Sequence, residues 1–252
     1  MISQHAFYGK HPAFVYVNNI VERVIDAAGA HQKRIGLIVL NAPKIVNAGV
    51  TKNDCMLVFS GLIQTAKTED EIAFVMGHEI AHLLAEHSQK KSHTSVGTVT
   101  VKALSILVGI AADAALSVAT NGASERNGLG GTGTTFMDSV GDGLTTLRYS
   151  REMELEADRI ALYIAAKAGY NPTAAKGWFE RMSKDNTHAG FFSSHPNSTD
   201  RLENIDKYLP LAISYYNSAP KRPSVFQTMA KQLEKNSSSK KSPKSAKAKN
   251  KS

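Results

Sequence analysis

The spacing of apolar residues changes twice within the first part of the chain. Residues 12–30 repeat with the 3.6-residue period of an amphipathic helix. Short, nearly continuous apolar runs follow at residues 35–40, 45–50 and 56–59, with Asn, Pro, Gly and Asp between them, as is typical of strands. Helical spacing then returns from residue 68 to about 91. The pattern predicts a helix, a small three-stranded sheet and a second helix.

Helical spacing also dominates the second half of the chain. Residues 136–168 predict one long helix or two, and residues 171–184 and 200–209 predict two more. The last of these is expected to end at Pro210, which has no backbone N–H to donate. After Tyr216 the pattern weakens. We therefore expect an α+β fold that is predominantly helical.

The most apolar stretch, residues 96–120, is too short in its charge-free part to be a convincing membrane span. That part covers residues 103–112, between Lys102 and Asp113, whereas a span needs about 18 apolar residues. An Asp near the centre of a spanning helix costs about 2.5–3.5 kcal/mol in lipid. We therefore expect a buried or lid-like helix here, with membrane contact as the alternative.

The second predicted helix carries the pattern H-E-x-x-H at His78, Glu79 and His82. Thr68 and Glu71 form a capping box at its start, which supports the helix. Residues four apart lie on one face, so both imidazoles can bind one ion, and neutral imidazole suits zinc. Glu79 is placed to act as general base on a zinc-bound water. The alternative, two solvated histidines on a polar surface, is disfavoured because the helix also has an apolar, packed side.

A third ligand is predicted on the helix that precedes Gly169. Glu154 and Asp158 are one turn apart on one face and are bounded by apolar residues, which is unusual unless a cation lies there. Glu154 would complete a set of three protein ligands, and Asp158 would accept the outer N–H of a ligand histidine. The alternative, a charged surface stripe, accounts for Glu152 and Glu156 but less well for the other two acids.

Three motifs follow one another in the chain: His78 to His82, then Tyr149-Ser150-Arg151 leading into Glu154-x-x-x-Asp158, then His195-Pro196 with Arg201 five residues beyond the proline. Together they resemble the gluzincin metalloendopeptidases that include the CAAX prenyl protease, HtpX, and the periplasmic and mitochondrial inner-membrane quality-control proteases. The similarity extends from about residue 35 to residue 216.

The resemblance implies a gluzincin-type metallopeptidase domain with an H-E-x-x-H helix and one Zn2+ per chain. It implies that His78, His82 and Glu154 are the zinc ligands and that Glu79 is the base. The implied function is zinc-dependent endoproteolysis of misfolded or membrane-associated proteins in protein quality control.

Two further residues take their roles from the resemblance. His195 is expected near the zinc, where it would either steady the oxyanion or close the site as a fourth ligand. Arg201 would anchor the segment around His195 or assist in catalysis. A latent protease, with the site blocked by His195 or by the glycine-rich segment, is a further alternative.

Polypeptide substrates are expected to bind as an added strand beside the one that starts at Ile45 and ends at Val50. The chain departs from the resemblance here, because relatives typically follow Asn47 and Ala48 with an aromatic residue and a Pro-Gly-Gly turn, which this sequence lacks. The departure affects the geometry expected for this strand.

A glycine-rich segment at residues 128–133 matches the letters G-x-G-x-x-G of dinucleotide-binding loops. Such a loop follows a β-strand, but small and polar residues precede this one, so no nucleotide cofactor is predicted. A mobile loop beside the metal site accounts better for the glycines.

The positive charge is concentrated at the end of the chain. From Lys231 onward there are eight Lys and one Glu, which is seven of the net eight positive charges. The rest of the chain is nearly neutral, which argues against a nucleic-acid-binding protein. The last segment, rich in Lys and Ser, is predicted to be disordered and to aid solubility, with contact to anionic lipid or nucleic acid as the alternative. A non-catalytic zinc protein that docks through this tail is the competing hypothesis for function.

We divide the chain into a zinc metallopeptidase domain (residues 1–216), a helical extension (217–235) and the disordered tail (236–252). The sole cysteine, Cys55, excludes an internal disulfide. No signal peptide is visible at the start, so we expect either an intracellular protein or a missing upstream leader. The resemblance suggests membrane association, in a periplasm or at the mitochondrial inner membrane.

Overall fold

The computed structural model describes residues 6–31, 34–51, 54–87, 149–184, 195, 199–221, 226 and 229. The predictions made for the apolar stretch at residues 96–120, the glycine-rich segment and the tail at residues 236–252 lie outside the described residues. The described part is mostly helical with one small sheet, as the sequence predicted.

Four strands form one mixed sheet in the order β1-β2-β4-β3: Ala6–Phe7 (β1), Gly36–Leu40 (β2), Ala48–Val50 (β3) and Cys55–Phe59 (β4). The central strands β2 and β4 are parallel, and both outer strands are antiparallel to their neighbours. The prediction of three strands was wrong because it missed β1. This strand has only two residues, too few to leave an alternating pattern, and it exists through its pairing with β2.

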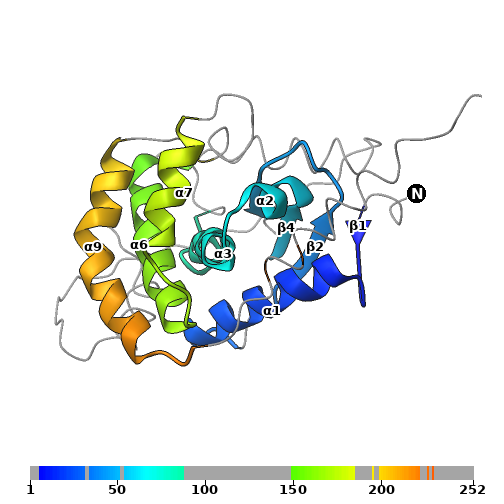
Figure 1. Cartoon of the computed structure of the whole chain (residues 1–252), viewed down its shortest axis with the longest axis horizontal. Helices are drawn as coiled ribbons and strands as arrows, with labels where there is room; N and C mark the ends of the chain where they lie inside the picture. The colour runs from blue at the N-terminus through cyan, green and yellow to red at the C-terminus, as the bar shows by residue number, and fades with distance from the viewer. Residues whose placement is uncertain are drawn as a thin grey trace, which may run out of the picture.

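The described residues also form six helices: Pro12–Ala27 (α1), Ser60–Thr65 (α2), Glu69–Leu84 (α3), Arg151–Lys167 (α6), Ala174–Met182 (α7) and Thr199–Ser218 (α9). Figure 1 shows α3 in the middle of the molecule, between the sheet on one side and α6, α7 and α9 on the other, with α1 running along one edge. Among the described residues, no helix combines the length and the apolar character that crossing a membrane requires.

Two helix ends differ from the prediction. Helix α3 ends at Leu84, not near residue 91, and α9 continues through Pro210 to Ser218. A proline inside a helix costs about 3 kcal/mol or more. Buried residues lie on both sides of it, Ile205 before and Ala212 after, so packing favours one continuous helix over a stop at the proline.

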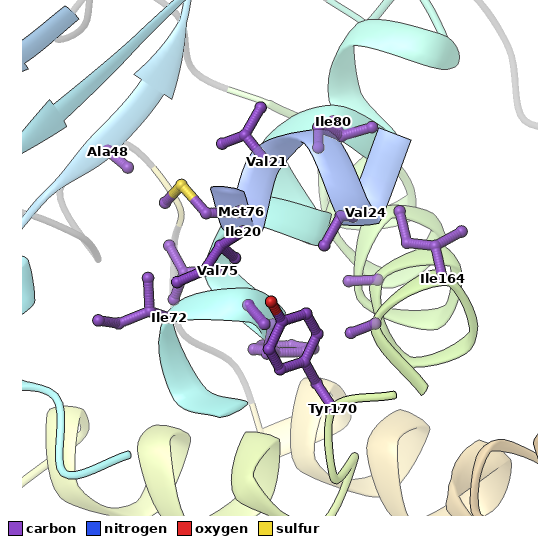
Figure 2. Close-up of a cluster of buried hydrophobic side chains, with 14 of the residues drawn as sticks. Ile20, Val21, Val24, Ala48, Ile72, Val75, Met76, Ile80, Ile164 and Tyr170 are labelled. Atoms are coloured by element: carbon purple, nitrogen blue, oxygen red, sulfur yellow. The ribbon is translucent and has the colours of Figure 1, made fainter. Parts of the chain in front are cut away.

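The core is built around α3. Figure 2 shows apolar residues of α3 packed with residues of α1, β3 and α6: Ile72, Val75, Met76 and Ile80 come from α3, Ile20, Val21 and Val24 from α1, Ala48 from β3 and Ile164 from α6. Helices α3 and α6 approach closely at Gly77, where an added Cβ would lie 3.3 Å from the Cα of Ala161. A side chain at position 77 would push α6 away from α3. It would do so next to His78, the residue after Gly77.

The chain beyond α9 returns to the core at two described positions. Phe226 and Met229 are both buried, and the ring of Phe226 lies 6.5 Å from that of Tyr16 on α1. Part of the predicted helical extension therefore contacts α1.

Candidate metal centre

Helix α3 directs both histidines of the H-E-x-x-H pattern toward one point. The helix begins with the predicted cap, in which the Thr68 hydroxyl accepts a hydrogen bond from the Glu71 N–H at 3.3 Å. The Nε2 atoms of His78 and His82 are 2.9 Å apart, and both side chains are buried. They are therefore not the solvated pair of the alternative interpretation.

Helix α6 brings two carboxylates to the same place. It begins after Ser150, whose hydroxyl accepts a hydrogen bond from the Met153 N–H at 3.3 Å. The Glu154 carboxylate lies 3.3 Å from Nε2 of His78 and 3.4 Å from Nε2 of His82. Asp158 lies on the outer side, where its Oδ1 is 3.0 Å from Nδ1 of His78. The structure thus brings together residues that are more than 70 positions apart in the sequence.

His195 joins this cluster. Its Nδ1 lies 3.2 Å from Nε2 of His78 and 3.0 Å from the Glu154 carboxylate. Ligand atoms of His78, His82, Glu154 and His195 all lie within 4.8 Å of one another. In a tetrahedral zinc site with bonds of about 2 Å, neighbouring donor atoms are about 3.3 Å apart. The buried donor set therefore fits one zinc ion without rearrangement of the helices.

Arg201 forms ion pairs with Asp158 and Glu154. Its guanidinium binds both oxygens of Asp158, each at 2.7 Å, and lies 2.8 Å from Oε2 of Glu154. It also donates a hydrogen bond to the backbone carbonyl of His195 at 3.3 Å. Burial raises the pKa of Asp158, but the charge of Arg201 outweighs it, so the net pKa lies below its ordinary value. One buried cation thus connects α6, α9 and the His195 segment.

Burial and the neighbouring charges shift the pKa values of the cluster in different directions. Burial lowers the pKa of His82 well below its ordinary value, with the neighbouring His78 in the same direction, so this imidazole is neutral. Burial raises the pKa of Glu154, but the charge of His195 and the hydrogen bonds from the histidines lower it by more than burial raises it, so the carboxylate is ionised. Burial lowers the pKa of His195, whereas Glu79 and Glu154 raise it to a net value of about 10. Burial lowers the pKa of His78, but Asp158 and Glu154 raise it above its ordinary value. Zinc binds neutral imidazole and ionised carboxylate, so zinc binding would release the protons of His78 and His195.

Glu79 lies beside these donors and is fully buried. One of its oxygens is 3.2 Å from Nε2 of His195. Neither oxygen accepts a well-aligned hydrogen bond within the described part of the chain. The contact with His195 leaves lone pairs of both oxygens without an aligned donor, so the carboxylate suits a proton donor that is brought in from outside, such as a water.

Sequence reasoning was wrong about His87 and gave no site role to Tyr149. If the helical spacing continued to about residue 91, His87 would be out of phase with His78 and His82 and would lie on the surface. It is instead buried, with Nδ1 2.9 Å from Nδ1 of His82. The ring of Tyr149 stacks on His82 at a centroid distance of 3.7 Å. The helical period assumed beyond Leu84 placed His87 out of phase with the ligands, and the early end of α3 removes that assumption.

Comparisons with known proteins agree with this geometry. The chain is 34% identical to "Mitochondrial metalloendopeptidase OMA1" of Schizosaccharomyces pombe, over 80% of this chain and 55% of that protein. It is 29% identical to "Metalloendopeptidase OMA1, mitochondrial" of Bos taurus, over 78% of this chain and 36% of that protein. It is 28% identical to "Metalloprotease LoiP" of Escherichia coli, over 64% of this chain and 58% of that protein.

The chain therefore spans only about a third to three fifths of the length of these relatives. The family described as "Peptidase family M48" matches residues 13–209, which include every residue of the cluster described above. On the extent of that match, this chain belongs to peptidase family M48.

Proposed function

We propose that this chain is a zinc-dependent metalloendopeptidase that hydrolyses peptide bonds of misfolded or membrane-associated proteins in protein quality control. The observation that carries the proposal is the buried cluster of His78, His82 and Glu154 with the buried carboxylate of Glu79 beside it. Relatives named as metalloendopeptidases and a metalloprotease support it. A zinc protein without activity would not need a buried carboxylate next to the donors.

In this proposal, His78, His82 and Glu154 hold the metal, and Asp158 fixes the tautomer of His78 by accepting its Nδ1–H. A bound zinc ion supplies Lewis-acid chemistry by polarising a carbonyl and lowering the pKa of a water. Glu79 accepts the proton of that water and later delivers it to the leaving amine. Arg201 keeps Asp158 and Glu154 ionised and in place.

Zinc removal tests the proposal. A chelator that strips the metal is expected to abolish cleavage of unfolded casein, and one equivalent of Zn2+ per chain is expected to restore it, because the described residues offer one such donor set. Metal content is measured on the purified protein alongside a gel-based cleavage assay. Full cleavage by a verified zinc-free protein would contradict the proposed function.

A latent form of the same enzyme is the second candidate, because the described conformation leaves the site inaccessible. His195 places one ring nitrogen among the ligands and the other against Glu79, and all three groups are buried. We propose that His195 closes the site as a fourth ligand and that a trigger must displace it before substrate can bind.

Replacing His195 by Ala separates the two roles given to this residue. If it closes the site, basal cleavage of casein is expected to rise about tenfold, which corresponds to about 1.4 kcal/mol of preference for the closed form. If it steadies the oxyanion instead, kcat is expected to fall by about 10²–10³-fold. The exposed His31, changed to Ala, serves as the control and is expected to leave the rate unchanged.

Substrate binding by strand addition beside β3 is also a proposal. Strand β3 is at the edge of the sheet and contacts α3, which suits an extended polypeptide that must reach Glu79. Ala48 and Val50 are buried, however, whereas Ile45 is 36% exposed. A substrate strand would therefore have to displace whatever covers this edge, which agrees with the latent form.

We also propose that the protein works at a membrane surface. Two of the relatives are named as mitochondrial, and the lysine-rich C-terminal segment has the charge to contact anionic lipid.

A further inference from the structure

The outer nitrogen of the ligand His82 faces a second histidine. Nδ1 of His82 is 2.9 Å from Nδ1 of His87, while Nε2 of His82 faces His78 and Glu154. On the far side, Nε2 of His87 lies 3.4 Å from Oε2 of Glu156, close enough for electrostatic attraction but not aligned as a hydrogen bond. His87 is 2% exposed, so water does not compete for these contacts. Glu156, His87 and His82 thus form a line from the partly exposed Glu156 to the centre of the cluster.

Hydrogen-bond chemistry fixes the protons along this line. A neutral imidazole has one N–H and one lone pair. If Nε2 of His82 gives its lone pair to the metal, its proton is on Nδ1 and must be donated to Nδ1 of His87. Nδ1 of His87 then acts as the acceptor, so His87 carries its proton on Nε2, which faces the Glu156 carboxylate. Only this arrangement gives each close pair one donor and one acceptor.

We propose that His87 is a positioning residue of the metal centre: it accepts the Nδ1–H of His82 and so holds this ligand in the tautomer and ring orientation that direct Nε2 to the ion. The negative charge of Glu156, near Nε2 of His87, favours a proton on that nitrogen. The inference rests on the ligand set proposed above. The two ligands on α3 then have different outer partners, since His78 is held by Asp158 and His82 by a histidine.

The end of α3 explains how His87 reaches this position. The N–H of His87 bonds to the carbonyl of His82 at 3.0 Å, and the N–H of Glu86 bonds to that of Leu83 at 3.2 Å. Glu86 has a φ of 56°, in the left-handed region. These are the two bonds of a Schellman motif, usually built with glycine. The motif folds the chain back over the last turn of α3, which brings His87 beside His82. The ring of Tyr149 also stacks on His82.

Zinc affinity tests the proposal. We would measure the zinc dissociation constant of the full chain by competition with a chromophoric chelator. His87→Phe fills the space but cannot accept a proton, and it is expected to weaken zinc binding by about 10–100-fold. His87→Gln, which keeps an acceptor oxygen, is expected to recover most of that loss. His31→Phe, at an exposed histidine that makes no contact with the cluster residues, is the matched control and should bind zinc like the wild type.

The thermal midpoints of the zinc-free variants separate positioning from stability. Equal midpoints for His87→Phe and His87→Gln with a difference in zinc affinity are the expected result. Zinc affinity of a folded His87→Phe variant within twofold of the wild type would overturn the proposal while leaving the zinc site intact. A wild-type chain that binds no zinc would overturn the proposed function as well.

Histidine tautomers in the zinc-loaded wild type give a test that needs no variant. Nitrogen-15 NMR of labelled histidine is expected to show the Nδ1–H form for His82 and the Nε2–H form for His87. A proton on Nδ1 of His87 would overturn the assignment, since that nitrogen could not then accept from His82.

Discussion

Changing Glu79 to Gln is expected to lower kcat/KM for unfolded casein by about 10²–10⁴-fold, the usual contribution of a general base. The amide is nearly the same size as the carboxylate but cannot accept the proton of the attacking water. Zinc binding is expected to persist, because Glu79 is not among the residues that cluster as ligands. Cleavage rate and metal content are therefore measured on the same preparation.

Glu152→Gln is the matched control for this variant. Glu152 is an exposed acid on α6, only two positions from Glu154, and its neutralisation should leave cleavage within about twofold of the wild type because a surface substitution changes little. Wild-type turnover by the Glu79→Gln protein would remove Glu79 from the role of base. Loss of zinc in that protein would instead mean that Glu79 helps to hold the metal.

Changing Arg201 to Met is expected to destabilise the protein by about 3–5 kcal/mol, the cost of removing one partner from a buried ion pair. Asp158 and Glu154 would both lose their buried cation, and the His195 carbonyl would lose a donor. Zinc would become the main charge that compensates Glu154, so the loss of stability should be larger after chelation than with zinc bound. Chemical denaturation with and without zinc measures both quantities.

Arg181→Met provides the comparison. Arg181 makes a similar two-bond contact with Glu71, at 2.8 and 2.6 Å, but away from the metal cluster and with 26% of its side chain exposed. Replacing Arg181 by Met is expected to lower the free energy of unfolding by less than Arg201→Met does. The decrease is expected to be the same with and without zinc. Equal costs for the two variants, independent of zinc, would show that Arg201 has no special link to the centre.

The local parts of the site could be predicted from the sequence. The capping box at Thr68, the one-turn spacing of His78 and His82 and the inward acids Glu154 and Asp158 all follow from helix geometry within a single element. His195 has no such pattern around it, and only the family resemblance indicated it. Its position depends on Arg201, which is six residues further along the chain and binds a different helix.

The structural features that the sequence did not predict have one physical cause: tertiary contacts determine the local structure there. Strand β1 exists because β2 pairs with it, and α9 passes Pro210 because residues on both sides are buried. His87 points inward because a non-glycine residue, Glu86, adopts a left-handed conformation that propensity disfavours. None of these features leaves a periodic signal in the sequence.

Anomalous diffraction at the zinc absorption edge, from crystals of the zinc-loaded chain, tests the central claim most directly. The account predicts a single peak within about 2 Å of Nε2 of His78, Nε2 of His82 and the Glu154 carboxylate, the distance of a zinc bond. No peak there, or a peak bound by other residues, would contradict the convergence of α3 and α6 on one metal ion.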